Sequence, residues 1–393
     1  TGVGPEGLLA IPERGLFVVA CEDDARDDKI RSTVMIYEYC GESTYPTIRS
    51  ADRPGTSVPI PWAALSGLVA DPSVPQRAYT IYDSFYQRSR IFGMDVGQEP
   101  ALIDSELVLS DVNGVLLTAL DGLKSQLPGT DDFDPAALVN ADGTVNLDPE
   151  GIAIDADGAF WVASEGTGNL VGGVSDPDNR PFERPNLLLE AVVSGGSTAT
   201  IERVVLPPLE LTRNQLRFGF EGVAAVGDDL YVAFQRAWTD AGDPSDRARI
   251  GRYDRNSGTW EFVYYPLEAP TSPNGGWVGL SELTWLGGDE LAVIERDNQG
   301  GPDGRIKRIY SFSIGGLTFR DDSQAPGFDL VTKTLELDLV AADVYGPTGG
   351  LLPEKQEGLA VLADGSALIV NDNDGVDDNS GETQLIVLPE LFD

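Results

Sequence analysis

Hydrophobic and polar positions follow one another in short runs along this chain, and one arrangement of these runs recurs six times. Each copy has an acidic or polar residue, then a short apolar strand, a tight turn, and a second apolar strand that ends on a polar residue. Short apolar runs joined by Asp-Gly or Gly-Asp turns are typical of β-hairpins. The copies start with PEGLLAI, LSGLVAD, PEGIAID, FEGVAAV, SELTWLG and QEGLAVL, near residues 5, 65, 149, 220, 281 and 356.

The repetition predicts a six-bladed β-propeller with long loops, an all-β fold in a single domain over residues 1–393. The first strand of each copy is apolar on both faces, as expected of a strand buried between neighbours. Further strands follow, for example at 248–255 and 259–267, so a copy can form a four-stranded blade. Apolar residues near helical spacing predict a short helical insertion within 112–146. The last copy has a third strand from Thr383 and no fourth, so its open edge invites self-assembly.

Composition and charge exclude several classes of function. With 27 basic and 64 acidic residues the net charge is −37, which disfavours nucleic acid as a partner. No run of apolar residues is long enough to span a membrane. Histidine is absent, which removes Ser-His and Cys-His nucleophile pairs and the usual zinc ligand. If 16–21 and 33–39 form a hairpin, Cys21 lies near Thr33 and about 20 Å from Cys40, which disfavours a disulfide bond.

Four motifs carry a resemblance to a known family: LDPEGIAIDADGAFWVASEG, GFEGVA, LAVIERDN and KQEGLAVLADGSALIVNDND. With these motifs the chain resembles the phytase-like family, "esterase-like activity of phytase", of bacterial secreted proteins. The resemblance implies a β-propeller, a secreted, extracellular or periplasmic location, and a phosphoester or ester hydrolase activity. The chain is more remotely similar to calcium propellers of the gluconolactonase and phosphotriesterase type. That similarity implies a glutamate presented to calcium in the central channel, with Asn371 and Asp372 as further ligands.

Glutamates at the start of the repeats are expected to converge on the channel, because equivalent residues of propeller blades lie on one ring. Two carboxylates about 6 Å apart repel by roughly 3 kcal/mol, so a cation, raised pKa values or outward-turned side chains must follow. Oxygen ligands without histidine or thiolate favour Ca²⁺, Mg²⁺ or Mn²⁺ over zinc and copper, and Ca²⁺ is the first expectation for the cofactor. The alternative is that each glutamate accepts hydrogen bonds from backbone N–H groups of the adjacent blade. The predicted metal ligands are Glu6, Glu150, Glu221, Glu282, Glu357, Asn371 and Asp372.

The second strand of each copy returns to the same end of the channel and predicts the catalytic groups. Glu165 or Asp297 is expected to orient water, and Arg296 to steady the anion. Arg236 and Lys355 are expected to bind substrate, although Arg296 and Lys355 could instead pair with the carboxylates.

The leading hypothesis is a calcium-dependent hydrolase that acts on a small anionic ester. The alternative is a non-catalytic calcium-binding module for adhesion or assembly that binds a cell-surface ligand. Two further features bear on a ligand site. The acidic segment 371–382 could form an irregular calcium loop, and Trp238 and Trp277 are the two tryptophans that could face a ligand.

Overall fold

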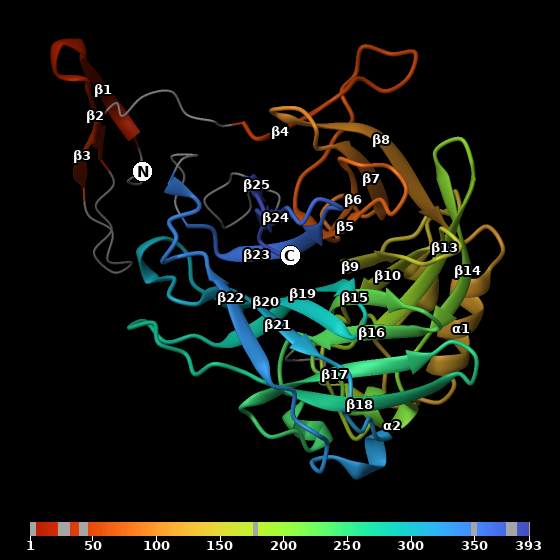
Figure 1. The fold of residues 1–393 in the computed structure, drawn as a ribbon. Coiled ribbons are helices and arrows are strands. Elements are labelled where there is room, and N and C mark those ends of the chain that lie inside the picture. Colours follow the sequence, from red (N-terminus) through yellow and green to blue (C-terminus); the bar gives the residue numbers. More distant parts are fainter. Residues whose placement is uncertain are drawn as a thin grey trace. The chain divides into compact units, whose positions relative to one another are not determined.

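A computed structural model describes residues 5–22, 32–38, 46–175, 180–346, 352–374 and 383–392 of the 393-residue chain (Figure 1). The chain divides into two compact units, Thr1–Thr44 and Tyr45–Asp393, and each is described by itself.

The first unit is a three-stranded antiparallel sheet formed by the first of the six repeats. Its strands are β1 (Pro5–Ile11), β2 (Leu16–Cys21) and β3 (Thr33–Glu38), in the order β1-β2-β3. The predicted hairpin is confirmed, because Cys21 lies opposite Thr33. Cys21 is buried and free, and Cys40 lies outside the described residues.

The second unit contains the other five repeats, and each begins with the hairpin that the sequence predicts. The first three blades are β5 (Leu65–Ala70), β6 (Arg77–Tyr82), β7 (Arg90–Asp95) and β8 (Ala101–Ser110); β9 (Pro149–Ile154), β10 (Phe160–Ser164), β13 (Leu187–Gly195) and β14 (Thr198–Val205); and β15 (Phe220–Val226), β16 (Asp229–Phe234), β17 (Arg247–Asp254) and β18 (Thr259–Pro266). The last two are β19 (Val278–Gly287), β20 (Glu290–Asp297), β21 (Lys307–Ser313) and β22 (Lys333–Asp338); and β23 (Lys355–Val361), β24 (Ala367–Asp372) and β25 (Leu385–Leu388). Four blades therefore have the predicted four strands, and the last has three among the described residues.

Several short elements accompany the blade strands. Strand β4 (Ile48–Ser50) pairs with β8, and β11 (Leu170–Val171) pairs with β12 (Val174–Ser175). The outer strands β8 and β14 also pair in parallel over three residues each, so the first two blades form one continuous sheet. The predicted helical insertion is confirmed as α1 (Val115–Lys124), whose Leu116, Leu120 and Leu123 pack into the core of these two blades. A second helix, α2 (Leu209–Thr212), follows β14.

The innermost strands β5, β9, β15, β19 and β23 form a closed ring, each lying against the next and β23 lying against β5 (Figure 1). Close backbone approach depends on glycine. A Cβ on Gly151 would lie 2.2 Å from the carbonyl oxygen of Glu221, and one on Gly358 would lie 2.6 Å from that of Ser66. A sixth inner strand has no room between β23 and β5. The structure therefore confirms the all-β propeller architecture, but the predicted count of six blades is not confirmed.

The described residues contain no helix with both the length and the apolar character needed to cross a membrane.

Candidate active site

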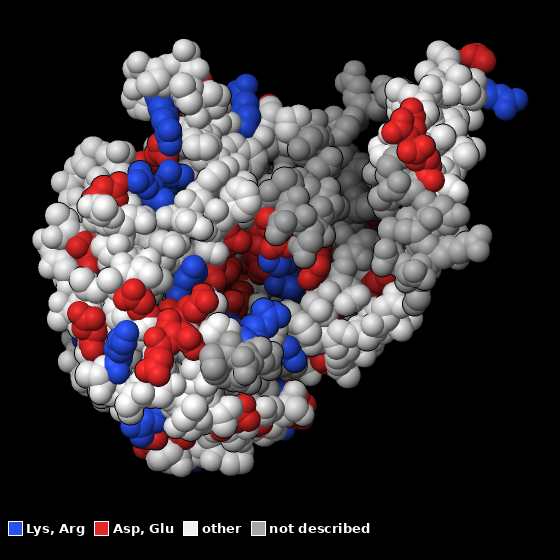
Figure 2. All heavy atoms as spheres, turned by 180° about the vertical axis from the view of Figure 1, so that it is seen from behind, with Lys and Arg blue, Asp and Glu red and all other residues white. Residues whose placement is uncertain are grey.

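The repeat glutamates lie together at one end of this ring, near the starts of the inner strands. Glu221, Glu282 and Glu357 are buried and Glu150 is half-buried. In β5 the matching position is Ser66, whose hydroxyl donates to Glu150 Oε2 at 2.6 Å. Figure 2 shows acidic and basic side chains gathered in a hollow of this unit. Glu6, the glutamate of the first repeat, is exposed on β1 of the other unit, and its role as a metal ligand stays a prediction.

Glu282 has the partners expected of a structural glutamate. Its Oε2 accepts the N–H of Leu68 from β5 at 2.8 Å, and its Oε1 accepts the N–H of Leu283 at 3.0 Å. The bond to Leu68 reaches from β19 to β5, which is not its neighbour in the ring. Burial raises the pKa of Glu282 well above the usual value, although the backbone donors oppose this shift. The alternative reading, a glutamate held by backbone N–H groups, thus describes Glu282.

Asp148, Glu150 and Glu165 form the first carboxylate cluster, with one oxygen of each within 4.8 Å of the others. The local chain explains this: Asp148 directly precedes β9, Glu150 is its second residue, and Glu165 directly follows β10, which pairs with β9. Glu165 Oε1 also accepts the N–H of Gly219 at 3.1 Å. Burial, followed by the charge of Asp148, raises the pKa of Glu165 to about 8 and that of Glu150 well above its usual value.

Asp83, Asp372 and Asp374 form a second cluster of the same size. Burial raises the pKa of Asp83 to about 6 and that of Asp372 to about 8. Lys355 already neutralises part of this cluster, because its Nζ lies 3.0 Å from Asp372 Oδ2 and also pairs with Asp374. The calcium loop predicted over 371–382 lies outside the described residues from 375 onward. Asn371 is buried, and its Oδ1 accepts the N–H of Gln384 at 2.7 Å.

Two buried oxygens near the clusters have no hydrogen-bond partner among the described residues. Gln235 donates through Nε2 to Glu221 at 2.6 Å, while its Oε1 is unpartnered. Glu357 pairs through Oε1 with Arg296, and its Oε2 is unpartnered. Burial, followed by the charges of Glu150 and Glu165, raises the pKa of Glu221 well above its usual value. Unsatisfied buried oxygens beside carboxylates are the groups that a bound cation would satisfy.

Of the three predicted catalytic residues, only Glu165 belongs to a carboxylate cluster. Arg296 is buried, pairs with Glu357 and donates through Nε to Ser281 at 2.9 Å. Asp297 is fully buried and pairs with Lys307 at 2.9 Å. It also accepts two backbone N–H groups through Oδ2, at 2.7 and 3.0 Å. The partners of Arg296 and Asp297 therefore leave little of either side chain for substrate.

A second group of residues beside the clusters combines arginine with aromatic rings. The guanidinium carbon of Arg236 lies 4.7 Å from the ring centre of Phe218 and 4.8 Å from that of Trp277, and the guanidinium carbon of Arg217 lies 4.3 Å from the ring centre of Phe218. Burial lowers the pKa of both arginines, and nearby arginines add to the shift. Trp277 is half-buried here, whereas Trp238 is fully buried and donates to the carbonyl oxygen of Phe218 at 2.9 Å.

Sequence reasoning missed Asp148, Arg217 and Phe218 as site residues, and it included Asp374 only as part of the acidic segment 371–382. Asp148 could have been found, because it stands two residues before the repeat glutamate at a strand start. Arg217 and Phe218 lie in a loop without hydrophobic periodicity, so no sequence signal marks them.

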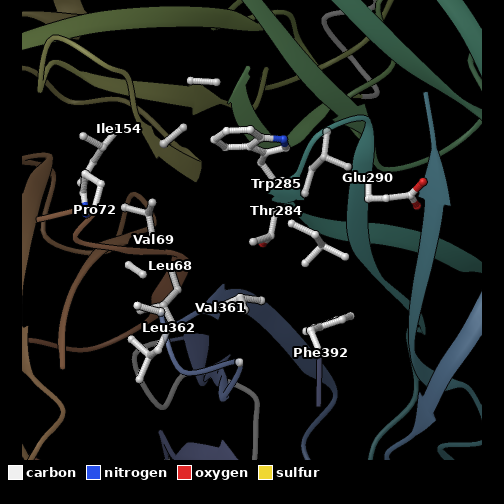
Figure 3. A pocket seen from close by; sticks show the side chains of 18 of the residues that line it. Leu68, Val69, Pro72, Ile154, Thr284, Trp285, Glu290, Val361, Leu362 and Phe392 are labelled. Carbon is white, nitrogen blue, oxygen red and sulfur yellow. The ribbon is translucent and has the colours of Figure 1, made fainter. Parts of the chain in front are cut away.

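The opposite end of the inner strands has a mixed apolar and polar lining. A pocket of about 790 Å³ is lined there by the later residues of the inner strands, including Leu68, Ile154 and Val361, and by Trp285 (Figure 3). Leu68, whose N–H donates to Glu282, is one of the residues that line this pocket.

Residues 60–375 match the family "Phytase-like: Esterase-like activity of phytase". An uncharacterized secreted protein of Arthroderma benhamiae is 27% identical over an alignment of 240 residues, and the match covers 52% of this chain and 46% of that protein. The chain thus matches about half of that relative's length.

Two solved structures show distant likeness. The PQQ-bound aldose sugar dehydrogenase of Streptomyces coelicolor is 11% identical with a TM-score of 0.35, over 84% of this chain and 95% of that one. A mutant of the Aleuria aurantia lectin in complex with α-methyl-L-fucoside is 14% identical with a TM-score of 0.37, over 96% and 92%. The family match covers most of the chain, and the chain therefore belongs to the phytase-like family described as "esterase-like activity of phytase".

Proposed function

We propose that this chain is a secreted, calcium-dependent hydrolase of phosphoesters or esters that acts at the acidic end of the propeller channel. The observation that carries the proposal is the cluster of Asp148, Glu150 and Glu165, whose oxygens lie within 4.8 Å of one another. The family match supports a hydrolase, and the name of the fungal relative supports secretion.

The residues fit a hard divalent cation. All candidate ligands are oxygens, which calcium prefers, and neither histidine nor thiolate is among them. Asp148, Glu150 and Glu165 would hold the ion, and the unpartnered oxygens of Gln235 and Glu357 are further candidates. The cluster of Asp83, Asp372 and Asp374 fits less well, because Lys355 already supplies a positive charge there.

Calcium bound at the first cluster would polarise the phosphoryl or carbonyl oxygen of the substrate. The chain's own residues would orient the water and hold the ligands in place. Glu165 is the candidate residue that orients the attacking water, because its carboxylate lies in the same cluster as the other two proposed ligands. Gly219 N–H fixes the orientation of that carboxylate. Ser66 holds Glu150 in the same way through its hydroxyl.

The test is turnover of 4-nitrophenyl phosphate and 4-nitrophenyl acetate by the native protein, with calcium and after chelation. We expect turnover of at least one substrate that chelation abolishes and calcium restores. Glu150→Gln and Glu165→Gln should lower kcat/KM by roughly 100-fold or more, since general-base catalysis alone contributes about 10²- to 10⁴-fold. Glu202→Gln, which changes an exposed carboxylate on β14, is the matched control.

If no ester or phosphoester is turned over in the presence of calcium, the enzyme proposal fails. Calcium-dependent binding to cell surfaces without turnover would favour the alternative of a non-catalytic extracellular module.

A further inference from the structure

Two arginines beside the carboxylate clusters lack the partners that most arginines of this unit have. Arg249, Arg255 and Arg296, for example, each pair with a buried carboxylate. Neither Arg217 nor Arg236 forms an ion pair or a side-chain hydrogen bond with a described residue, although the chain has 64 acidic residues and only 27 basic ones. Carboxylate partners are therefore abundant, and two half-buried cations without them call for another explanation.

Aromatic rings hold both guanidinium groups in place. Phe218 contacts Arg217 and Arg236, and Trp277 contacts Arg236, at distances of 4.3 to 4.8 Å from ring centre to guanidinium carbon. Phe218 and Trp277 also pack on each other, with ring centres 5.2 Å apart. A guanidinium that lies over a ring keeps its N–H groups in the plane of the fork, where they can donate to an oxyanion. The rings thus orient both arginines without using their donors.

Backbone connections place this pair next to the proposed catalytic groups. Arg217 is two residues before Gly219, whose N–H donates to Glu165 at 3.1 Å. Arg236 directly follows Gln235, which donates to Glu221 at 2.6 Å. An anion bound by the arginines would therefore adjoin the cluster of Asp148, Glu150 and Glu165.

We propose that Arg217 and Arg236, oriented by Phe218 and Trp277, form a subsite that binds an oxyanion group of the substrate, a phosphate or a carboxylate. This inference rests on the proposed function for the identity of the ligand as a substrate, but not for anion binding itself. It also explains how a strongly acidic protein accepts an anionic ester: the subsite supplies local positive charge against the repulsion of the net charge of −37.

The direct test is calorimetric titration of the calcium-loaded protein with sodium sulfate and sodium acetate, which stand for the two kinds of oxyanion. We expect the native protein to bind at least one of them. Arg217→Gln and Arg236→Gln should bind it roughly 10- to 100-fold more weakly, which corresponds to one charged hydrogen-bonding group. Arg236→Lys keeps the charge and loses the planar guanidinium, so its affinity for the anion should lie between those of the native protein and Arg236→Gln. The matched control Arg88→Gln removes an exposed arginine elsewhere and should leave binding unchanged.

Two further readouts protect the test from misfolded variants and from failure of the enzyme proposal. In the native protein, sulfate should shield Arg217 and Arg236 from phenylglyoxal, as measured by mass spectrometry. If turnover exists, the arginine variants should lower kcat/KM for 4-nitrophenyl phosphate or 4-nitrophenyl hemisuccinate and leave the neutral 4-nitrophenyl acetate almost unaffected. Whichever anionic substrate is affected identifies the oxyanion.

Unchanged sulfate and acetate binding in both folded glutamine variants, together with no shielding of the native arginines, would overturn the subsite. An equal loss for neutral and anionic substrates would do the same. Absence of any turnover would refute the proposed hydrolase function but not the anion subsite, because the titration and the shielding experiment do not depend on catalysis.

Discussion

The carboxylate cluster of Asp148, Glu150 and Glu165 should make the stability of the metal-free protein fall as pH rises. Two full charges 4.8 Å apart repel by about 3.5 kcal/mol at an effective dielectric constant near 20, so three ionised carboxylates would repel strongly. The fold keeps some of these groups protonated instead, which is why burial and Asp148 raise the pKa of Glu165 from 4.5 to about 8. A shift of this size corresponds to at most about 5 kcal/mol.

The sign follows from proton linkage. Between about pH 4.5 and 8 the folded protein holds a proton on Glu165 that the unfolded chain has released, so each rise in pH lowers the free energy of unfolding. The stabilising contribution is complete below about pH 4.5 and lost once pH passes about 8. Calcium should reverse the trend, because it binds the deprotonated carboxylates and stabilises the folded state that holds them.

The assay is thermal or urea unfolding followed by circular dichroism at constant ionic strength, between pH 5 and pH 9, with chelator or with calcium. We expect the metal-free protein to lose several kcal/mol across this range and calcium to restore most of the loss at high pH. Glu165→Gln should flatten the metal-free profile and weaken the calcium effect, whereas Glu202→Gln should do neither.

A metal-free profile that is flat or rises between pH 5 and pH 9 would refute this reasoning. Equal stabilisation by calcium of the native protein and of Glu165→Gln would show that the ion binds elsewhere.

Three further substitutions test the packing of the propeller. Arg249→Met leaves fully buried Asp243 without its ion pair and should cost about 3–5 kcal/mol in urea unfolding; a loss below about 1 kcal/mol would contradict this. Gly151→Ala forces a Cβ to 2.2 Å from a carbonyl of the next blade and should cost about 3 kcal/mol, whereas Gly122→Ala in α1 meets nothing within 4 Å and should be neutral or stabilising. Glu282→Gln should lower stability without changing calcium affinity, and a matching loss of affinity would instead make Glu282 a ligand.

The sequence predicted the strands and the helix better than it predicted the number of blades that close the propeller ring. Hairpins and α1 follow from alternating apolar runs, turn glycines and helical spacing, which are local properties. The number of blades depends on how closely the inner strands approach, and the contact of Gly358 with Ser66 that excludes a sixth strand joins residues at opposite ends of the chain. No pattern within one repeat contains that information.

The same limit applies to the site. The convergence of repeat glutamates could be predicted because equivalent positions lie on one ring, and four of the five lie at one end of the channel. The ion pairs could not be predicted. Arg296 pairs with Glu357, and Asp297 pairs with Lys307, only because the fold brings their side chains together. Arg217 stands in a loop whose position is set by Glu165, a residue 52 positions earlier in the sequence.

Ring closure has a consequence for biosynthesis. The bond from the N–H of Ala64 to Asn373 Oδ1, at 2.9 Å, and the bond from the N–H of Leu385 to Thr47 Oγ1, at 2.7 Å, join the first blade to the last. A ribosome must therefore synthesise the chain through about residue 385 before these two bonds can form, and until then the flank of the first blade stays uncovered. Chaperone protection of the nascent chain, or export before folding, would suit such an architecture.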